Sequence, residues 1–237
     1  MAILIDQREP PERSATDRPH ARLGPSDSAR WMNCPGSINL TEKLKGGRQS
    51  TVWSAEGTFA HLIREECLDL GFEPYDFVGH RLRVDGYLFE WTEEDARYLQ
   101  PGIDRVREFH GKRYLETRVT LEKWSEDVFG TLDVGIAARS ATVINDLKWG
   151  MGVPVDVVGN TQLRIYALGF WWQIARHLTD AKEVILIIDQ PRMKGHTKSD
   201  IEFEDLEEDD EDDEPPQLTG GNEWRIKVKD LLEFGNE

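Results

Sequence analysis

Apolar residues in the first half of the chain recur at a spacing of three and four positions, which is the period of an α-helix. The strongest pattern runs from about Ala55 to Leu70, and Gly71 directly after it favours a helix end, because glycine readily adopts the left-handed conformation found there. The predicted buried face consists of Ala60, Ile63, Cys67 and Leu70. We therefore expect one long amphipathic helix that packs against a core.

Two further helices are predicted later in the chain. One begins at Thr92, where the acids that follow favour a helix N-terminus, and we expect Pro101 to interrupt it before it ends near Gly111. The other runs from about Asn160 to Leu178. Segments of a different period lie between these helices, so helices and strands are expected to alternate.

These other segments show the alternation and the short apolar runs of β-strands. Leu82–Trp91 is predicted to form a small hairpin that turns near Asp85 and Gly86. The expected strands are Tyr114–Leu121, Phe129–Ala138, Thr142–Trp149 and the fully apolar Lys182–Asp189. The order helix, three strands, helix, strand predicts an α/β fold with a mixed central β-sheet flanked by helices.

Composition divides the chain into three expected parts. Residues 1–24 are polar and proline-rich, which is typical of a flexible arm. The folded domain is expected over residues 25–192. Residues 193–237 are predicted to be an acidic linker or tail, because positions 202–214 carry 11 acids, followed by a short terminal strand or helix at Trp224–Phe234.

The overall charge follows from that acidic run. The chain has 237 residues and a net charge of −16, of which −11 belongs to residues 202–214, so the remainder is only mildly acidic. Two cysteines exclude a disulfide-rich scaffold and any four-cysteine zinc or iron–sulfur site built from this chain alone. The charged start at Met1–Arg13 and the short apolar runs lead us to expect no signal peptide, no membrane span and a cytoplasmic protein.

Two carboxylates are expected to meet in the sheet. If Arg139 and Ser140 form the loop of a hairpin, Asp133 lies directly opposite Asp146, with Cβ atoms about 4.5–5.5 Å apart. Carboxylates held that close repel each other unless a proton or a cation joins them. Lys148 shares the face of Asp146 and can neutralise one acid, whereas a hard cation such as Mg²⁺ or Mn²⁺ can serve both. A simple surface Asp–Lys ion pair is the alternative.

Four short motifs occur in order along the chain. They are Gly57-Thr58-x-x-His61, Gly130-Thr131-Leu132-Asp133, Asp146-Leu147-Lys148 and Gln162-Leu163-Arg164-Ile165-Tyr166. In this order and spacing the chain resembles the RecB-like branch of the PD-(D/E)XK nuclease superfamily, of the kind found in phage-encoded RecB-like exonucleases. The resemblance covers about residues 24–192, and the proline that names the motif is replaced by Leu132. It implies a restriction-endonuclease-like αβββαβ core and metal-dependent cleavage of DNA.

The resemblance also implies roles for individual residues. It makes His61, Asp133, Asp146 and the backbone carbonyl of Leu147 ligands of Mg²⁺ or Mn²⁺, and it makes Lys148 the group that orients or deprotonates the attacking water. The residues expected to line the site or the DNA path are Gln162 and Tyr166, with Glu116 as a water-mediated ligand. Taken without the motif, His61 can be a core histidine and Glu116 can pair with Arg113 or Arg118.

Cofactors and partners are predicted by the same resemblance. Relatives with an iron–sulfur cluster use four cysteines, whereas this chain has only Cys34 and Cys67, so no cluster is expected. DNA is the expected substrate, and a single-strand annealing protein and further copies of the chain are candidate partners. The setting implied is the cytoplasm of a bacterium or of a phage-infected cell.

The leading hypothesis is therefore a Mg²⁺- or Mn²⁺-dependent deoxyribonuclease, with exonuclease action favoured over endonuclease action. The alternative is a non-catalytic nucleic-acid- or protein-binding module on a nuclease scaffold, with an acidic tail that mimics DNA. The acidic run at residues 202–214 can equally be a solubilising tail, and the net negative charge requires any DNA groove to be locally positive.

Overall fold

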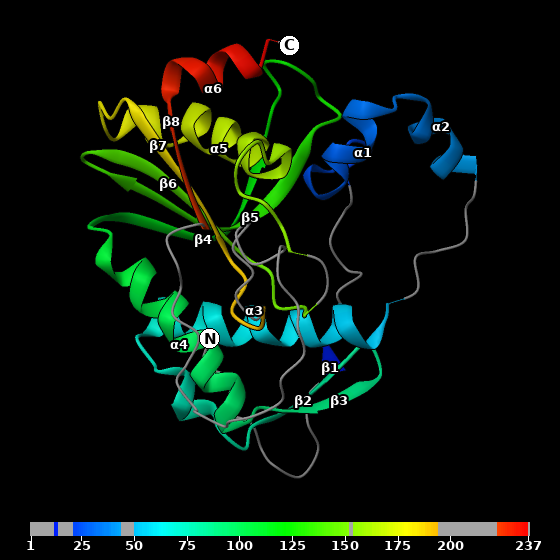
Figure 1. Cartoon of the computed structure of the whole chain (residues 1–237), viewed down its shortest axis with the longest axis vertical. Coiled ribbons are helices and arrows are strands. Elements are labelled where there is room, and N and C mark those ends of the chain that lie inside the picture. Colours follow the sequence, from blue (N-terminus) through cyan, green and yellow to red (C-terminus); the bar gives the residue numbers. More distant parts are fainter. Residues whose placement is uncertain (1–11, 14–20, 44–49, 152–153, 194–221, 237) are drawn as a thin grey trace, which may run out of the picture.

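The computed structural model describes residues 12–13, 21–43, 50–151, 154–193 and 222–236, and it is built around a five-stranded β-sheet (Figure 1). The strands of this sheet, in spatial order, are β4 (Gly111–Thr120), β5 (Phe129–Ala138), β6 (Ala141–Leu147), β7 (Glu183–Asp189) and β8 (Glu223–Lys227). β6 and β7 run parallel, and the other neighbouring pairs are antiparallel. The predicted α/β fold with a mixed central sheet is confirmed.

Helices cover both faces of this sheet (Figure 1). α3 (Val52–Leu70) and α4 (Glu93–Glu108) lie on one face, and α5 (Thr161–Gln173) and α6 (Val228–Phe234) lie on the other. The smaller elements beside them are η2 (Pro25–Asp27), α1 (Ser28–Asn33), α2 (Gly36–Lys43), η3 (Pro74–Phe77) and η4 (Ala175–His177). A second sheet combines β1 (Glu12–Arg13), β2 (Arg81–Val84) and β3 (Tyr87–Glu90), and its predicted turn at Asp85 and Gly86 is confirmed by their positive φ angles.

Side chains of the central strands fill two separate cores, one under each pair of helices. On β6, Val143 packs toward α3 and α4, whereas the next residue, Ile144, packs toward α5. On β7 the same alternation sends Ile187 and Leu186 to opposite faces. Because both faces of β7 are covered, its apolar sequence is continuous rather than alternating.

Helix α3 largely matches its predicted pattern. Thr51 caps its N-terminus by accepting a hydrogen bond from the Ser54 amide at 3.2 Å, and Gly71 ends it with φ of 81°. Its buried residues form two adjacent rows with a spacing of four, which are Phe59, Ile63 and Cys67 and then Ala60, Arg64 and Leu68. The prediction for Leu70 is wrong: it is 45% exposed at the C-terminal end of α3, where it is the last helical residue.

Helix α4 corrects a second prediction. Pro101 lies inside the helix without interrupting it. Proline removes one backbone hydrogen bond, but the helix is held from both sides of that position by apolar side chains that are almost fully buried, namely Ala96, Leu99, Ile103 and Val106. Thr92 and Asp95 also cap its start through reciprocal hydrogen bonds. The packing of this face therefore outweighs the local cost of the proline.

The C-terminal segment corrects the predicted end of the folded domain at residue 192. β8 pairs with β7 along its length, and α6 buries Leu231 and Phe234 against α5. Trp224–Phe234 is thus part strand and part helix within the same folded unit. A short terminal element was predicted here, but its place in the domain was not, because five strand residues followed by a short helix show neither period for long enough.

Parts of two expected regions lie outside the described residues. These are residues 1–11 and 14–20 of the predicted arm and the acidic run at 202–214. Glu12 and Arg13, within the arm, pair with β2. Within the described ranges, no helix combines the length and the apolar character that crossing a membrane requires.

Truncation of Leu231 tests whether the terminal helix belongs to the core. Leu231→Ala is expected to lower the free energy of unfolding by about 2–5 kcal/mol, because the side chain is fully buried and its removal leaves a cavity. Leu70→Ala is the matched control and is expected to cost under about 1 kcal/mol, since that leucine is half exposed. Urea unfolding of both variants measures the difference. Equal losses would place α6 outside the core.

Candidate metal centre

Strands β5 and β6 separate at the position of the two predicted carboxylates. Their paired residues run from Ala137–Thr142 to Val134–Asn145, which is the predicted register, and Asp133 and Asp146 are the next positions along. β5 nevertheless continues beside β4, and β6 continues beside β7. The sheet therefore forks here, and we call this place the fork, defined by Asp133 and Asp146. The Leu147 amide closes it by donating to Asp133 Oδ2 at 2.8 Å.

A histidine and two carboxylates converge on one side of the fork. His61 Nδ1 on α3 lies 3.4 Å from Asp133 Oδ2 and 3.9 Å from Glu116 Oε1 of β4. One ligand atom from each of the three side chains lies within 4.8 Å of the others. We call these three residues the His–acid cluster. One imidazole nitrogen and two carboxylate oxygens suit a divalent cation such as Mn²⁺ or Mg²⁺ and leave coordination positions open for water and substrate.

Glu116 occupies an unusual backbone conformation. Its φ is 41°, in the left-handed region that non-glycine residues seldom adopt. The β4–β5 ladder passes from the pair Leu115–Val134 to the pair Thr117–Leu132, so Glu116 lies across from Asp133 without taking part in the ladder. Such conformations are typical of functional sites, where the surrounding structure imposes them. In this protein the left-handed conformation of Glu116 places its carboxylate beside His61.

Asp146 belongs to a second group of side chains at the fork. Its Oδ2 lies 2.7 Å from Lys148 Nζ, and its Oδ1 accepts a hydrogen bond of 3.2 Å from the amide of Gln162 on α5. Lys148 Nζ in turn donates to Gln162 Oε1 at 3.1 Å. The three side chains close a triangle. Asp146 therefore shares both oxygens with protein partners, although it stands next to Asp133.

Burial and charge shift the acid–base properties of this triangle. Burial of Asp146, together with the nearby charge of Asp133, raises the pKa of Asp146. Burial acts against the Lys148 ammonium, but the adjacent Asp146 carboxylate outweighs it and raises the pKa of Lys148. Lys148 is consequently a cation at neutral pH. Burial also raises the pKa of Tyr166, which is neutral beside the site.

The glycine before the Asp133 motif has a packing role. A Cβ atom at Gly130 would lie 3.0 Å from a ring carbon of Tyr166 and 2.9 Å from Pro25. Only glycine lets β5 approach α5 and η2 this closely at the fork. The Gly130-Thr131-Leu132-Asp133 motif thus combines a close strand–helix contact with the carboxylate three residues later.

A buried arginine connects the fork to the core. The Arg64 side chain on α3 is 2% exposed, and its guanidinium lies 3.6 Å from Asp133 Oδ2 and 3.2 Å from Asp189 Oδ2. It also donates to Asn145, whose amide donates to Asp189 at 2.8 Å. Burial raises the pKa of Asp189, and Arg64 opposes this shift. Buried ions of this kind are tolerated only when they are paired and hydrogen-bonded.

The network continues to the far edge of the sheet. Arg105 of α4 lies 4.0 Å from Asp189 Oδ1 and 3.0 Å from Glu223 Oε2 of β8. Gly102 of α4 makes room for the Asp189 carboxylate, since a Cβ there would come within 3.1 Å of Asp189 Oδ2. Alternating charges therefore run from Asp133 through the core to the C-terminal strand.

The structure groups the predicted site residues in two neighbouring sets. His61, Glu116 and Asp133 form the His–acid cluster, while Asp146, Lys148 and Gln162 form the triangle. The roles predicted for the Leu147 carbonyl and for Tyr166 stay predictions. Sequence reasoning missed Arg64, Asn145 and Asp189. The sequence did contain a signal for these residues: Asn145 and Asp189 are polar positions within the apolar strands β6 and β7, and Arg64 lies on the buried side of α3.

Comparison with known families adds one finding. A family model described as "Protein of unknown function (DUF2800)" matches residues 20–220, which include both groups of site residues. The chain belongs to the DUF2800 family.

Replacing the buried arginine tests the charge network of the DUF2800 chain. Arg64→Met is expected to lower the free energy of unfolding by about 3–5 kcal/mol, because it leaves Asp189 buried without its main cation. Adding Asp189→Asn should recover part of the loss, since a neutral amide needs no counter-charge. Urea unfolding of the single and double variants gives the coupling. Arg118→Met, at an exposed arginine, is the control. Strictly additive losses of unfolding free energy for Arg64→Met and Asp189→Asn would contradict the network.

Proposed function

We propose that this DUF2800 protein is a metal-dependent deoxyribonuclease. The observation that carries the proposal is the convergence, at one fork of the sheet, of a His–acid cluster with an Asp–Lys–Gln triangle. The resemblance of the same motifs to RecB-like nucleases supports DNA as the substrate. Exonuclease action, a bacterial or phage-infected setting and an annealing partner are part of the proposal on that resemblance alone.

The donor set fits the expected cofactor. In this proposal His61, Glu116 and Asp133 hold a Mg²⁺ or Mn²⁺ ion. Asp146 can join them, because a carboxylate oxygen accepts more than one contact and Asp146 stands next to Asp133. A bound cation of this kind supplies Lewis acidity toward a phosphodiester and lowers the pKa of its water.

Lys148 has a defined electrostatic task in this proposal. Since the Asp146 carboxylate raises its pKa, its ammonium stays charged at neutral pH and has no lone pair with which to accept a proton. Its role is to orient a water molecule and to stabilise the negative charge that develops on the phosphate. Gln162 positions both residues, because its amide nitrogen donates to Asp146 and its amide oxygen accepts from Lys148. Of the two roles that the resemblance allows for Lys148, we therefore propose orientation.

DNA digestion tests the reaction. End-labelled linear DNA is expected to be degraded with Mg²⁺ or Mn²⁺ and to survive with EDTA. Asp146→Ala and Lys148→Ala should each slow degradation by roughly 10²–10³-fold. Lys148→Ala removes the ammonium that acts on the reacting phosphate, and Asp146→Ala removes the carboxylate that pairs with that ammonium. Asp127→Ala, at an exposed acid on the surface, is the control.

Two outcomes would contradict this reading of the reaction. Normal digestion by the Lys148→Ala protein would refute the role of the ammonium. Digestion of covalently closed circular DNA at the same rate as linear DNA would refute exonuclease action while leaving the nuclease proposal intact.

Calorimetric titration with Mn²⁺ tests the ligand set. Glu116→Gln and Asp133→Asn are each expected to weaken Mn²⁺ binding at least about tenfold, because each removes an anionic donor from the His–acid cluster. Asp127→Asn should bind as the wild type does. If Glu116→Gln keeps wild-type affinity while Asp146→Asn loses it, the ligand set is the one implied by the resemblance. A wild-type protein that binds no Mn²⁺ would favour the non-catalytic module.

A further inference from the structure

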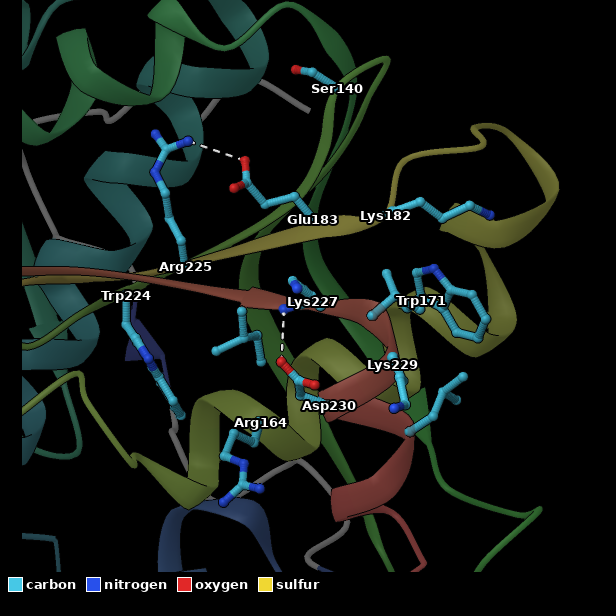
Figure 2. A pocket seen from close by; sticks show the side chains of 13 residues that line it. Ser140, Arg164, Trp171, Lys182, Glu183, Trp224, Arg225, Lys227, Lys229 and Asp230 are labelled. Carbon is cyan, nitrogen blue, oxygen red and sulfur yellow. Dashed lines mark hydrogen bonds and ion pairs between the residues drawn. The ribbon is translucent and has the colours of Figure 1, made fainter.

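A cationic groove lies at the end of β6 and β7 that is remote from the fork. Its volume is about 1130 Å³, and it is bordered by the β5–β6 turn at Ser140, the start of β7, β8 and the first residues of α6 (Figure 2). The length of β6, roughly 20 Å, separates it from the fork. It is therefore distinct from the candidate metal centre.

The groove carries more positive than negative charge. Its basic lining residues are Arg164, Lys182, Arg225, Lys227 and Lys229, and its acidic ones are Glu183 and Asp230. The excess of three positive charges occurs on a chain whose net charge is −16. A local reversal of sign on an acidic protein is the feature expected where a polyanion binds.

Both acids of the groove are already engaged by the protein. Glu183 pairs with Arg225 at 3.1 Å, and Arg225 also contacts Glu223 at 2.6 Å. Asp230 accepts the Lys227 backbone amide at the start of α6. Lys229 lies 3.5 Å from Glu233, but its side chain is 81% exposed, so that pair is weak. The exposed lysine side chains, including Lys182 and Lys227, thus present the excess charge to solvent.

Two tryptophans border the same groove. Trp171 of α5 and Trp224 of β8 are half-buried and pack against the core under α5 and α6. Trp171 lies beside Lys182 and Lys229, whereas Trp224 lies on the opposite side of β8 from Arg225 (Figure 2). Lysines that border a groove together with partly exposed indole rings match a single nucleic-acid strand, in which phosphates pair with the ammonium groups and unstacked bases pack on the rings. Free phosphate would contact only the charged side chains. The bases of a duplex are stacked inside the helix and would not reach the indole rings.

We propose that this groove binds single-stranded DNA and anchors the substrate strand away from the site of cleavage. The inference rests on the proposed nuclease function and adds a second DNA contact to it. Neutralising phosphates releases bound counterions, so binding at the groove should weaken steeply with salt.

The test measures the anisotropy of a fluorescent oligothymidylate of about 20 nucleotides, titrated with the full chain in EDTA so that cleavage is prevented. The test variant is Lys182→Glu with Lys227→Glu. The matched control is Arg81→Glu with Lys112→Glu, which makes the same charge change at exposed residues outside the groove. We expect the test variant to lose at least tenfold in affinity and to lower the salt slope by about 1.4, the value for two single-strand phosphate contacts. The control should lose less than about threefold.

A second comparison addresses the rings. An abasic oligomer of the same length is expected to bind the wild type at least tenfold more weakly than the oligothymidylate, because it offers phosphates but no bases. Equal binding of the two oligomers, equal losses in the test and control variants, or a test variant with wild-type affinity would each overturn the proposal. Displacement of the oligothymidylate by vesicles of anionic phospholipid, but not by unlabelled oligothymidylate, would overturn it in favour of a membrane surface.

The two proposals fail in different ways. A chain that digests DNA with Mg²⁺ but whose binding ignores the groove substitutions refutes the groove and leaves the nuclease. A chain that binds oligothymidylate through the groove but never cleaves DNA refutes the nuclease and leaves a single-strand-binding surface.

Discussion

The arrangement of the fork depends on balancing three carboxylates that the sheet places on neighbouring strands. Glu116, Asp133 and Asp146 come from β4, β5 and β6, and without compensation they would repel one another. Each has a nitrogen partner: His61 and Arg64 of α3 lie beside Glu116 and Asp133, and Lys148, directly after β6, lies beside Asp146. The strands bring the acids together, and the partners make that placement tolerable. The same crowding is what a divalent cation held at the fork, as we propose, would relieve.

This balance also explains why helix α3 packs as it does. A helix that faces a sheet normally buries apolar residues, but α3 places the Arg64 side chain in its buried rows. The guanidinium reaches Asp133 on one side and Asp189 on the other, so it fixes the helix to both branches of the forked sheet. The apolar rows alone would tolerate small shifts along the helix axis, whereas paired buried charges require one position.

Much of this architecture was predictable from the sequence, because it rests on short-range patterns. The strand periods, the two-residue hairpin loop and the resulting register of Asp133 and Asp146 are local properties. The pairing within the arginine network was not predictable from local patterns, since Arg64 lies 81 and 125 residues from Asn145 and Asp189, and an arginine in an amphipathic helix usually faces solvent. Glu116 was undecided for a similar reason, because its position beside His61 depends on a backbone angle that no local motif encodes.

The contact between Arg105 and Glu223 has a consequence for how the protein matures. Glu223 lies on β8, which follows residues 194–221 in chain order, whereas all the acids of the fork come from earlier strands. A ribosome therefore releases the fork and its helices before the strand that completes their chain of alternating charges. During translation the emerging domain has four of the five strands of this sheet and an arginine that lacks its outer partner. Pairing of β8 with β7, and of Glu223 with Arg105, therefore waits until the last part of the domain has been synthesised.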